Sequence, residues 1–252
     1  MVSIHRLNEE CQMLCGGVLL SSSVVLTAAH CILDTDTNEL YKNNEIKVRV
    51  GSKYWLGFGG KEFSALKMHI HNYKDGDDYR NDIGIIHLDQ NISDEFIKSK
   101  GIKFPKIYNR GISSKTKAMV LGWGETKYEY SSRTILAVNV NISFSEICKK
   151  YVYWSGNNKH TICANPENSR ICPGDSGGPL VFGQIESNNK RAKNVIIGIA
   201  SFNMFEQKKP PKCGADYMTD YYANAYYYLN WISEKSNINV EDLKYFKKAK
   251  AI

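Results

Sequence analysis

No apolar run in the sequence approaches the roughly 20 residues that a helix needs to cross a lipid bilayer. No segment has the charged start, short apolar stretch and small-residue cleavage site of a secretory signal peptide either. The 252 residues are 42% hydrophobic and 23% charged, which is ordinary for a folded chain and excludes wholesale disorder. We therefore expect no membrane partner, and a secreted form would have lost its signal before this sequence begins.

Metal-binding and nucleic-acid-binding signatures are also missing. The seven cysteines include no Cys-x-x-Cys pair, and no carboxylate or cysteine at ligand spacing joins His69 and His71 in a metal site. The formal net charge is +7, but no basic helix or nucleic-acid module accompanies the scattered lysines. We therefore expect no metal, no cofactor and no nucleic-acid partner.

The cysteines and two sequons indicate the compartment. Seven cysteines without a metal pattern are typical of an oxidised, extracellular chain, and the odd number leaves one over. The sequons at Asn91 and Asn141 are compatible with a secretory route, although such triplets also arise by chance. We expect a secreted protein and leave glycosylation at both asparagines open.

Helical periodicity is nearly absent before residue 220, where short strand-like segments separated by turns dominate. The clearest are Cys15–Leu20, Val24–Cys31, Ile46–Val50, Leu66–Ile70, Ala118–Trp123, Leu136–Ile142, Thr161–Ala164, Leu180–Phe182 and Asn194–Phe202. This pattern predicts an all-β protein made of two barrels or sandwiches. The polar stretch from Asn91 to Ser114 is expected to be a loop that divides the halves, and Tyr221 to Lys235 is the one good helical candidate.

A serine stands in a constrained turn that runs from Cys172 to Leu180, with the sequence CPGDSGGPL. Because glycine has no side chain, the hydroxyl of Ser176 stands clear and backbone N–H groups can converge beside it. This is the architecture of a catalytic nucleophile, whereas an isolated Gly-Asp-Ser-Gly is more often an ordinary surface turn. A base and an orienting acid elsewhere in the chain would decide between the two.

His30 and Asp82 are the candidates for that base and acid. His30 follows an apolar run and two alanines that leave room around the imidazole, although a lone histidine at a strand end is usually just a hydrogen-bonded residue. Asp82 directly precedes a mostly apolar strand, so it is drawn into a low-dielectric environment where its charge needs a partner. A histidine N–H would serve as that partner.

Several motifs occur in the order and rough spacing of the trypsin/chymotrypsin-like serine peptidases, which the sequence resembles from about Met1 to Trp231. The motifs are Thr27-Ala28-Ala29-His30-Cys31, Asn81-Asp82-Ile83-Gly84, Gly122-Trp123-Gly124, Gly174-Asp175-Ser176-Gly177-Gly178-Pro179 and Ser201-Phe202. The resemblance implies an all-β fold of two packed six-stranded antiparallel β-barrels with a C-terminal α-helix. One peptidase domain would span 1–252, with an N-terminal barrel over about 1–108, a C-terminal barrel and helix over about 109–235, and a lysine-rich tail over 236–252.

The resemblance also implies the role of each site residue. Ser176 would be the nucleophile and His30 the general base and then acid, while Asp82 would fix the imidazole tautomer and stabilise its cation. The backbone N–H groups of Gly174 and Ser176 would form the oxyanion hole, and Ser201 would support the buried aspartate. The implied disulfides are Cys15 with Cys31, Cys148 with Cys163, and Cys172 with Cys213, which leaves Cys11 over.

The expected substrate pocket departs from the family pattern. Its base would be Arg170, beside Ile171, where trypsin-like members carry an aspartate, so cleavage after Lys or Arg is not supported. Asp220 would face Arg170 from the pocket wall. Either Arg170 receives an acidic substrate side chain, or it pairs with Asp220 and leaves a shallow site for small or apolar residues, or none. A third outcome is that Asp220 dominates the pocket and restores cleavage after Lys or Arg. We favour the internal pair, because an unpaired buried charge is costly.

Other walls of the pocket differ as well. Phe202 replaces the usual tryptophan, and Asn203 stands where a glycine normally lets the substrate backbone approach. The segment from Met204 to Lys212 is longer than in typical members and is stiffened by Pro210 and Pro211, so it is expected to overhang the cleft.

Family members are activated when a new N-terminal ammonium group inserts beside the aspartate that precedes the nucleophile, here Asp175. The sequence begins at Met1, inside the expected first strand, so it is either a fragment or a chain that stays zymogen-like. Without an ammonium partner Asp175 would be a desolvated charge, and we expect the loop around Ser176 to be disordered or rearranged.

The resulting prediction is a secreted serine endopeptidase, a monomer that acts on protein or peptide substrates and would also bind protein protease inhibitors. We expect an acidic or a small or apolar residue before the scissile bond. The alternative is a catalytically silent homologue that acts as a binding or decoy protein. The presence of His30, Asp82 and Ser176 favours the enzyme, whereas Arg170 and Asn203 favour the silent homologue.

Overall fold

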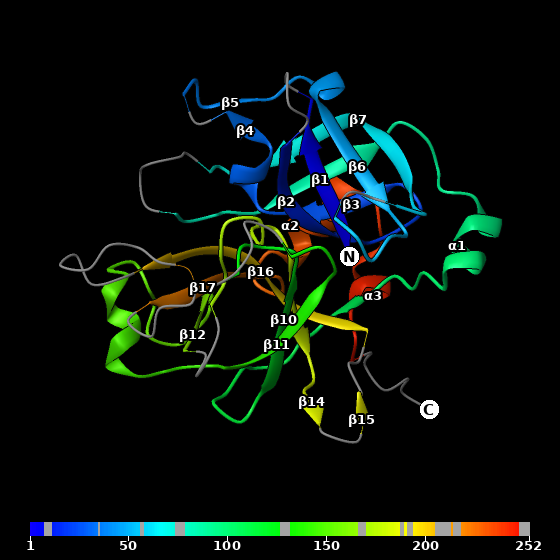
Figure 1. Ribbon diagram of the computed structural model, residues 1–252. Helices are drawn as coiled ribbons and strands as arrows, with labels where there is room; N and C mark the ends of the chain where they lie inside the picture. Colours follow the sequence, from blue (N-terminus) through cyan, green and yellow to red (C-terminus); the bar gives the residue numbers. More distant parts are fainter. Residues whose placement is uncertain are drawn as a thin grey trace.

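A computed structural model shows the chain as two strand-rich halves packed against each other (Figure 1). The structure describes residues 1–7, 12–34, 36–55, 58–73, 79–126, 132–165, 170–186, 189–190, 194–204, 213 and 218–246. Cys11, residues 205–212 of the expected overhanging segment and residues 247–252 of the tail lie outside these ranges. Of the helices in the described ranges, none is both long and apolar enough to cross a membrane.

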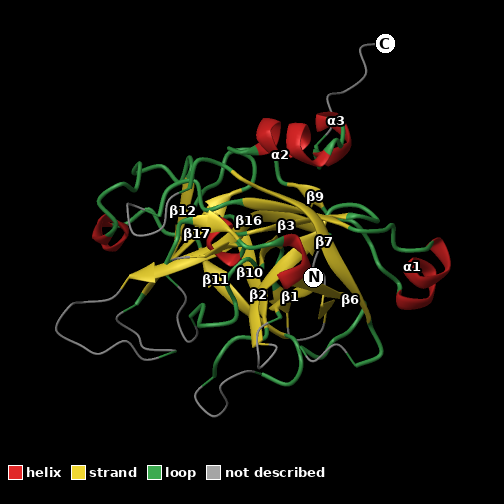
Figure 2. Cartoon of the chain, turned by 90° about the horizontal axis from the view of Figure 1, so that it is seen from above, coloured by secondary structure: helices red, strands yellow, loops and turns green. Residues whose placement is uncertain are grey.

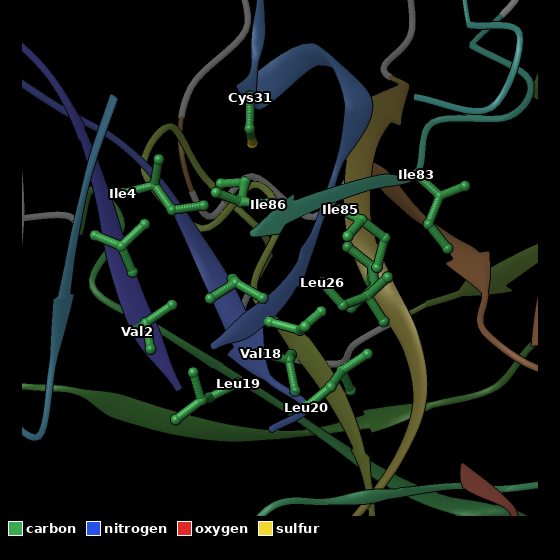
Figure 3. Packing of buried hydrophobic residues seen from close by; sticks show 14 of the residues in the cluster. Val2, Ile4, Val18, Leu19, Leu20, Leu26, Cys31, Ile83, Ile85 and Ile86 are labelled. Carbon is green, nitrogen blue, oxygen red and sulfur yellow. The ribbon is translucent and has the colours of Figure 1, made fainter. Parts of the chain in front are cut away.

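The first half is a closed antiparallel barrel. In order around it lie β1 (Val2–Arg6), β2 (Gln12–Leu19), β3 (Val24–Thr27), β8 (Gly84–Leu88), β7 (Lys61–Ile70) and β6 (Ile46–Val50). Alternation in β6 buries Ile46, Val48 and Val50 and leaves Lys47 and Arg49 partly exposed. Apolar side chains from β1, β2, β3 and β8 fill the same interior (Figure 3). Each such side chain contributes about 1.5–3 kcal/mol on burial.

The second half is a curled antiparallel sheet. Its strands are, in order, β11 (Leu136–Asn141), β10 (Lys117–Gly122), β13 (Pro179–Phe182), β16 (Val195–Met204), β17 (Thr219–Asn224) and β12 (Thr161–Ala164), with β9 (Lys106–Ile107) pairing in parallel with β16. The first and last strands meet through a bridge between Ile142 and Ala164 and a hydrogen bond from Ser143 N–H to the Cys163 carbonyl (2.9 Å). The two-barrel prediction is therefore confirmed.

Three disulfides are present, and they are the same three pairs that the resemblance implies. Their Cα–Cα separations are 5.9 Å for Cys15–Cys31, 5.9 Å for Cys148–Cys163 and 5.6 Å for Cys172–Cys213. The remaining short elements are η1 (Ala29–Cys31), β4 (Leu33–Asp34), β5 (Glu39–Leu40), η2 (Asn43–Glu45), η3 (Glu146–Lys150), β14 (Ile185–Glu186) and β15 (Asn189–Lys190).

We expected the stretch between the halves to be a loop throughout. This is wrong, because the helix α1 (Asp94–Lys100) forms within it. The side chain of Ser93 caps the helix by accepting from the Phe96 N–H, and Gly101 ends it in a left-handed conformation with φ of 61°. Both are ordinary helix start and stop signals. The helix was missed because it is short and none of its residues is buried.

The predicted start of the C-terminal helix is wrong, because residues from Tyr221 to Asn224 belong to β17. Strands β12 and β16 flank β17, and all of its residues are buried. Tyrosine favours such a packed strand, and a strand covered on both faces shows no alternation that would distinguish it from a helix. The helix predicted to reach Lys235 is instead α2 (Leu229–Ser236).

The C-terminal segment returns to the first half of the chain. Leu229 and Ile232 of α2 join the core of the first barrel. The following helix α3 (Val240–Leu243) lies next to α2 (Figure 2), and the Tyr245 N–H then donates to the carbonyl of Ile107 in β9 at 3.0 Å. Residues 229–245 thus tie together the first barrel and β9, the strand that links the two halves.

Candidate active site

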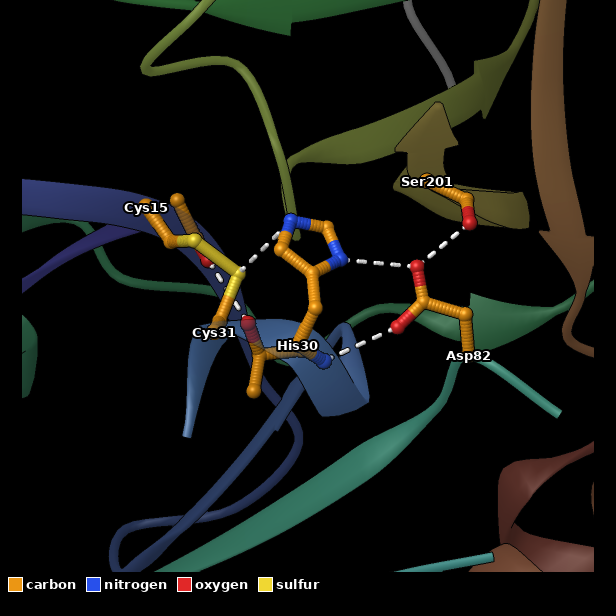
Figure 4. A network of polar contacts seen from close by, with 7 residues as sticks. Cys15, His30, Cys31, Asp82 and Ser201 are labelled. Atoms are coloured by element: carbon orange, nitrogen blue, oxygen red, sulfur yellow. Dashed lines mark hydrogen bonds and ion pairs between the residues drawn. A yellow bond between two sulfur atoms is a disulfide. The ribbon is translucent and has the colours of Figure 1, made fainter. Parts of the chain in front are cut away.

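The antiparallel pairing of β3 with β8 brings His30 and Asp82 together. Thr27 and Gly84 are paired at the end of β3 and the start of β8, so the residues just beyond them meet at one edge of the barrel. Nδ1 of His30 lies 2.8 Å from Oδ2 of Asp82, and the backbone N–H of His30 donates to Oδ1 at 3.0 Å (Figure 4). The carboxylate therefore holds both the ring and the main chain of His30.

Asp82 is buried, with 2% of its surface exposed. Burial alone would raise the pKa of its carboxyl, but the charge of His30 and the hydrogen bonds from His30 and Ser201 outweigh burial and hold the pKa below its ordinary value. Asp82 is therefore ionised at neutral pH. An ionised acceptor beside Nδ1 keeps the ring proton on that nitrogen, so the lone pair stands on Nε2.

Ser201 connects this pair to the second half of the chain. It lies in β16, at a bulge between Ala200 and Phe202 that interrupts the pairing with β17. Its hydroxyl donates a hydrogen bond to Oδ2 of Asp82 (Figure 4). The acid of the first barrel is thus fixed from the second.

Cys15, His30 and Cys31 are the one cluster of potential metal-ligating side chains found in the described ranges. Nε2 of His30 lies 3.8 Å from Sγ of Cys31. Both sulfurs, however, are joined in the Cys15–Cys31 disulfide, and a metal needs a thiolate. The cluster is therefore a brace that fixes η1 against β2 (Figure 4).

The loop that carries Ser176 projects from the second half and packs against the first. The Ser176 carbonyl accepts a hydrogen bond from the Gly16 N–H of β2 at 2.7 Å. Gly177 has φ of +73°, and a Cβ there would lie 2.2 Å from Oγ1 of Thr27 and 3.2 Å from Sγ of Cys31. Only glycine permits this approach. The contact places the loop beside Thr27 at the end of β3, against the Cys15–Cys31 disulfide.

The side chain of Asp175 lies against the segment Gly122-Trp123-Gly124. Its Oδ1 accepts from the Gly124 N–H at 2.8 Å and its Oδ2 from the Cys172 N–H at 3.0 Å. A Cβ on Gly122 would lie 1.7 Å from Oδ1 of Asp175, and a Cβ on Gly124 would lie 2.4 Å from its Oδ2. These close approaches explain why Trp123 is flanked by glycines. Burial raises the pKa of Asp175 to about 6, although the two hydrogen bonds oppose the shift. The loop around Ser176 lies within the described range 170–186, and its expected rearrangement in a zymogen-like chain stays a prediction.

A cavity of about 520 Å³ opens beside Ser176 and Ser201. Its lining comprises Glu125, Ile171, Cys172, Pro173, Ser176, Ser201, Phe202, Asn203, Cys213 and Met218. The side chain of Asn203 crosses from one wall to the other, since its Nδ2 donates to the Ile171 carbonyl at 2.9 Å. The hydrogen bond between Asn203 and Ile171 therefore links two parts of the cavity wall.

Arg170 and Asp220 lie behind this lining and are buried, with 6% and 0% of their surfaces exposed. Oδ2 of Asp220 accepts from the Ile171 N–H at 3.0 Å. Burial raises the pKa of Asp220 to about 7, against the opposing effects of the Ile171 hydrogen bond and the Arg170 charge. Neither of the two groups predicted at the pocket base is therefore part of the cavity lining, although Asp220 bonds the backbone of Ile171, which is.

The raised pKa of Asp220 has a consequence for stability. The folded chain keeps this proton between about pH 4 and 7, where the unfolded chain has lost it, so stability should fall as pH rises through that window. Asp220→Asn should therefore raise the free energy of unfolding at pH 8, by at most about 4 kcal/mol, and should flatten its decline above pH 5. Urea unfolding at several pH values measures this. Asp89→Asn, at an exposed aspartate, is the control. If the stability of Asp220→Asn falls with pH as steeply as that of the unaltered protein, Asp220 does not cause the decline.

Sequence reasoning missed Tyr79. Its ring stacks on Phe202 with centroids 4.5 Å apart, and Phe202 in turn stacks on Tyr221 at 4.9 Å. Because Phe202 lines the cavity and Tyr79 is 41% exposed, the stack forms an aromatic rim. The one feature of the sequence that could have pointed to Tyr79 was its position three residues before Asp82.

Comparisons with known proteins agree with this geometry. The family model described as "Trypsin" matches residues 1–232. The chain is 33% identical to trypsin delta of Drosophila melanogaster over 193 residues, which is 75% of this chain and 68% of that protein. It is 30% identical to trypsin epsilon of Drosophila erecta over 235 residues, covering 92% and 80%. Among solved structures it is similar in fold to neuropsin, described as a serine protease expressed in the limbic system of mouse brain, with a TM-score of 0.69, 24% identity and 93% of each chain covered.

Proposed function

Because the chain belongs to the trypsin family and is thus a serine-type endopeptidase, we propose that Ser176, His30 and Asp82 are its catalytic triad. The observation that carries this proposal is the hydrogen-bonded pair of His30 and Asp82, held by Ser201 at the edge of the cavity that Ser176 lines. We further propose that the chain cleaves after small or apolar residues.

In this mechanism Ser176 Oγ attacks the carbonyl carbon of the scissile amide while Nε2 of His30 takes the hydroxyl proton. Asp82 stabilises the imidazolium through Nδ1–H. His30 then gives the proton to the leaving amine, the acyl-enzyme forms, and water releases it by the same steps. The N–H groups of Gly174 and Ser176 would bind the oxyanion, each contributing about 3–4 kcal/mol. Gly174 has φ of +92°, a conformation that favours glycine.

The proposed specificity rests on the walls of the cavity. The hydrogen bond from Asn203 to the Ile171 carbonyl occupies space that a long substrate side chain would need. Such a side chain would therefore have to break this hydrogen bond. Arg170 and Asp220 lie behind the lining, where each reduces the cost of burying the other's charge. A small or apolar side chain fits such a site, whereas an acidic one would have to reach past Ile171.

Replacing Asn203 with glycine should test this directly. The unaltered protein should prefer small or apolar residues before the scissile bond in a peptide library, and Asn203→Gly should raise kcat/KM for large side chains about tenfold or more, because one bridge is removed. Asn157→Gly, an exposed asparagine outside the cavity lining, is the matched control. A preference for Lys or Arg would overturn the proposal, and a preference for Asp or Glu would show that Arg170 is accessible.

The wider setting follows from the same features. Serine peptidases of this family act on protein substrates, and the three disulfides support an oxidising, extracellular compartment. We propose a secreted monomer that protein protease inhibitors also bind. We also propose one peptidase domain over 1–252, with barrels over about 1–108 and 109–235 and a tail over 236–252.

A further inference from the structure

Asp82 is the middle residue of a very tight turn. The Ile83 N–H donates to the Asn81 carbonyl at 2.7 Å, so the hydrogen bond spans Asp82 alone. Asn81 enters the turn with φ of +60° and Tyr79 precedes it with φ of +56°, both in the left-handed region that residues other than glycine seldom adopt. The direction of the Asp82 carboxylate thus depends on whether this turn is held.

A tyrosine from the far end of the chain contacts the turn. The Tyr228 hydroxyl donates to Oδ1 of Asn81 at 3.2 Å, across 147 positions of sequence. Tyr228 is 3% exposed and directly precedes α2, whose residues Leu229 and Ile232 are part of the first-barrel core. The hydroxyl is therefore anchored to the same barrel as Asp82.

The ring of Tyr228 is also fixed. The His71 ring lies edge-on to it at 5.3 Å, and the Tyr227 ring lies edge-on at 4.9 Å. Burial, followed by the neighbouring Tyr227, raises the pKa of the Tyr228 hydroxyl well above its ordinary value, so the group remains a donor at every pH where a peptidase works. The hydroxyl can thus hold Asn81 over the whole range.

We propose that Tyr228 is a positioning residue for the catalytic acid: its hydroxyl holds the left-handed Asn81 turn and so aims Asp82 at His30. This inference rests on the proposed triad. Ser201 fixes the carboxylate itself from the second half, and Tyr228 fixes the backbone that carries it. Packing alone would need only the ring of Tyr228, whereas positioning needs the hydroxyl.

Tyr228→Phe separates the two roles, because it keeps the ring against His71 and removes only the donor. Acylation by p-nitrophenyl acetate should slow about tenfold, and the acid limb of its pH profile should move to lower pH, because a misdirected carboxylate stabilises the imidazolium less well. Tyr227→Phe, the exposed neighbour, should change neither. Asn81→Gly keeps the left-handed backbone accessible and removes the Oδ1 acceptor but not the backbone hydrogen bond of Asn81 with Tyr228, so it should slow acylation less than Tyr228→Phe does.

A readout that needs no turnover separates this inference from the proposed function. The Nδ1–H proton of His30, identified in the proton NMR spectrum by its loss in His30→Ala, should shift in Tyr228→Phe and not in Tyr227→Phe. If Tyr228→Phe lowers only the melting temperature and leaves the resonance and the pH profile in place, the positioning role is overturned. An unaltered protein that shows the resonance but no acylation would instead contradict the proposed function.

Discussion

Replacing Ser176 with alanine is expected to lower kcat for peptide hydrolysis by about 10⁶-fold, because no other group in the proposed site can form the acyl-enzyme. The loop should survive the change, since its fixed points are the Gly16 hydrogen bond and the Gly177 contact and not the serine hydroxyl. The circular dichroism spectrum and melting temperature should therefore match those of the unaltered protein.

Ser99→Ala is the control for that experiment. Ser99 is an exposed serine on α1, at the outer edge of the molecule in Figure 1, and its hydroxyl bonds only to the Phe96 carbonyl among the described contacts. Its removal should leave kcat unchanged. Peptide hydrolysis that survives in purified Ser176→Ala would show that another residue is the nucleophile.

Asp82→Asn should have the second largest effect, a fall in kcat of about 10⁴-fold, the value known for this change in the family. The His30 backbone N–H would keep the amide oxygen on the Oδ1 side, so the amide NH₂ would face Nδ1 of His30. A donor there forces the ring proton onto Nε2, which can then no longer accept the proton of Ser176. Activity should therefore fall although the site keeps its shape.

Kinetics at several pH values, with Asp89→Asn as the control, measure this second effect. Asp89 is an exposed aspartate just after β8 and bonds the Ser64 N–H. A loss of less than tenfold in Asp82→Asn would mean that the ring of His30 is oriented by something other than Asp82.

The members of the proposed triad could be selected as candidates from local signals, whereas their roles came from the family resemblance. His30 follows an apolar strand and Asp82 precedes one, and antiparallel pairing of such strands brings their ends together. The glycines around Ser176 likewise have local meaning, since a Cβ on Gly177 would collide with the first barrel. Such positions need no knowledge of the rest of the fold.

The walls and supports of the site could not be predicted in this way. The aromatic run after residue 220 contains a strand, a turn and the start of a helix, and only pairing with β12 and β16 distinguishes them. Tyr228 was therefore assigned to packing, although its hydroxyl reaches Asn81. Arg170 and Asp220 were predicted at the base of the pocket, but neither is part of the cavity lining, a detail that depends on side-chain packing.

The central claim is that Ser176 is an activated nucleophile, and covalent labelling tests it most directly. The folded protein is incubated with a fluorophosphonate and the adduct is located by mass spectrometry of its peptides. We predict one adduct, on Ser176, that disappears in Ser176→Ala and forms far more slowly in His30→Ala. A folded protein that takes up no label, or takes it up elsewhere, would contradict the account and would support a silent homologue that only binds its partners.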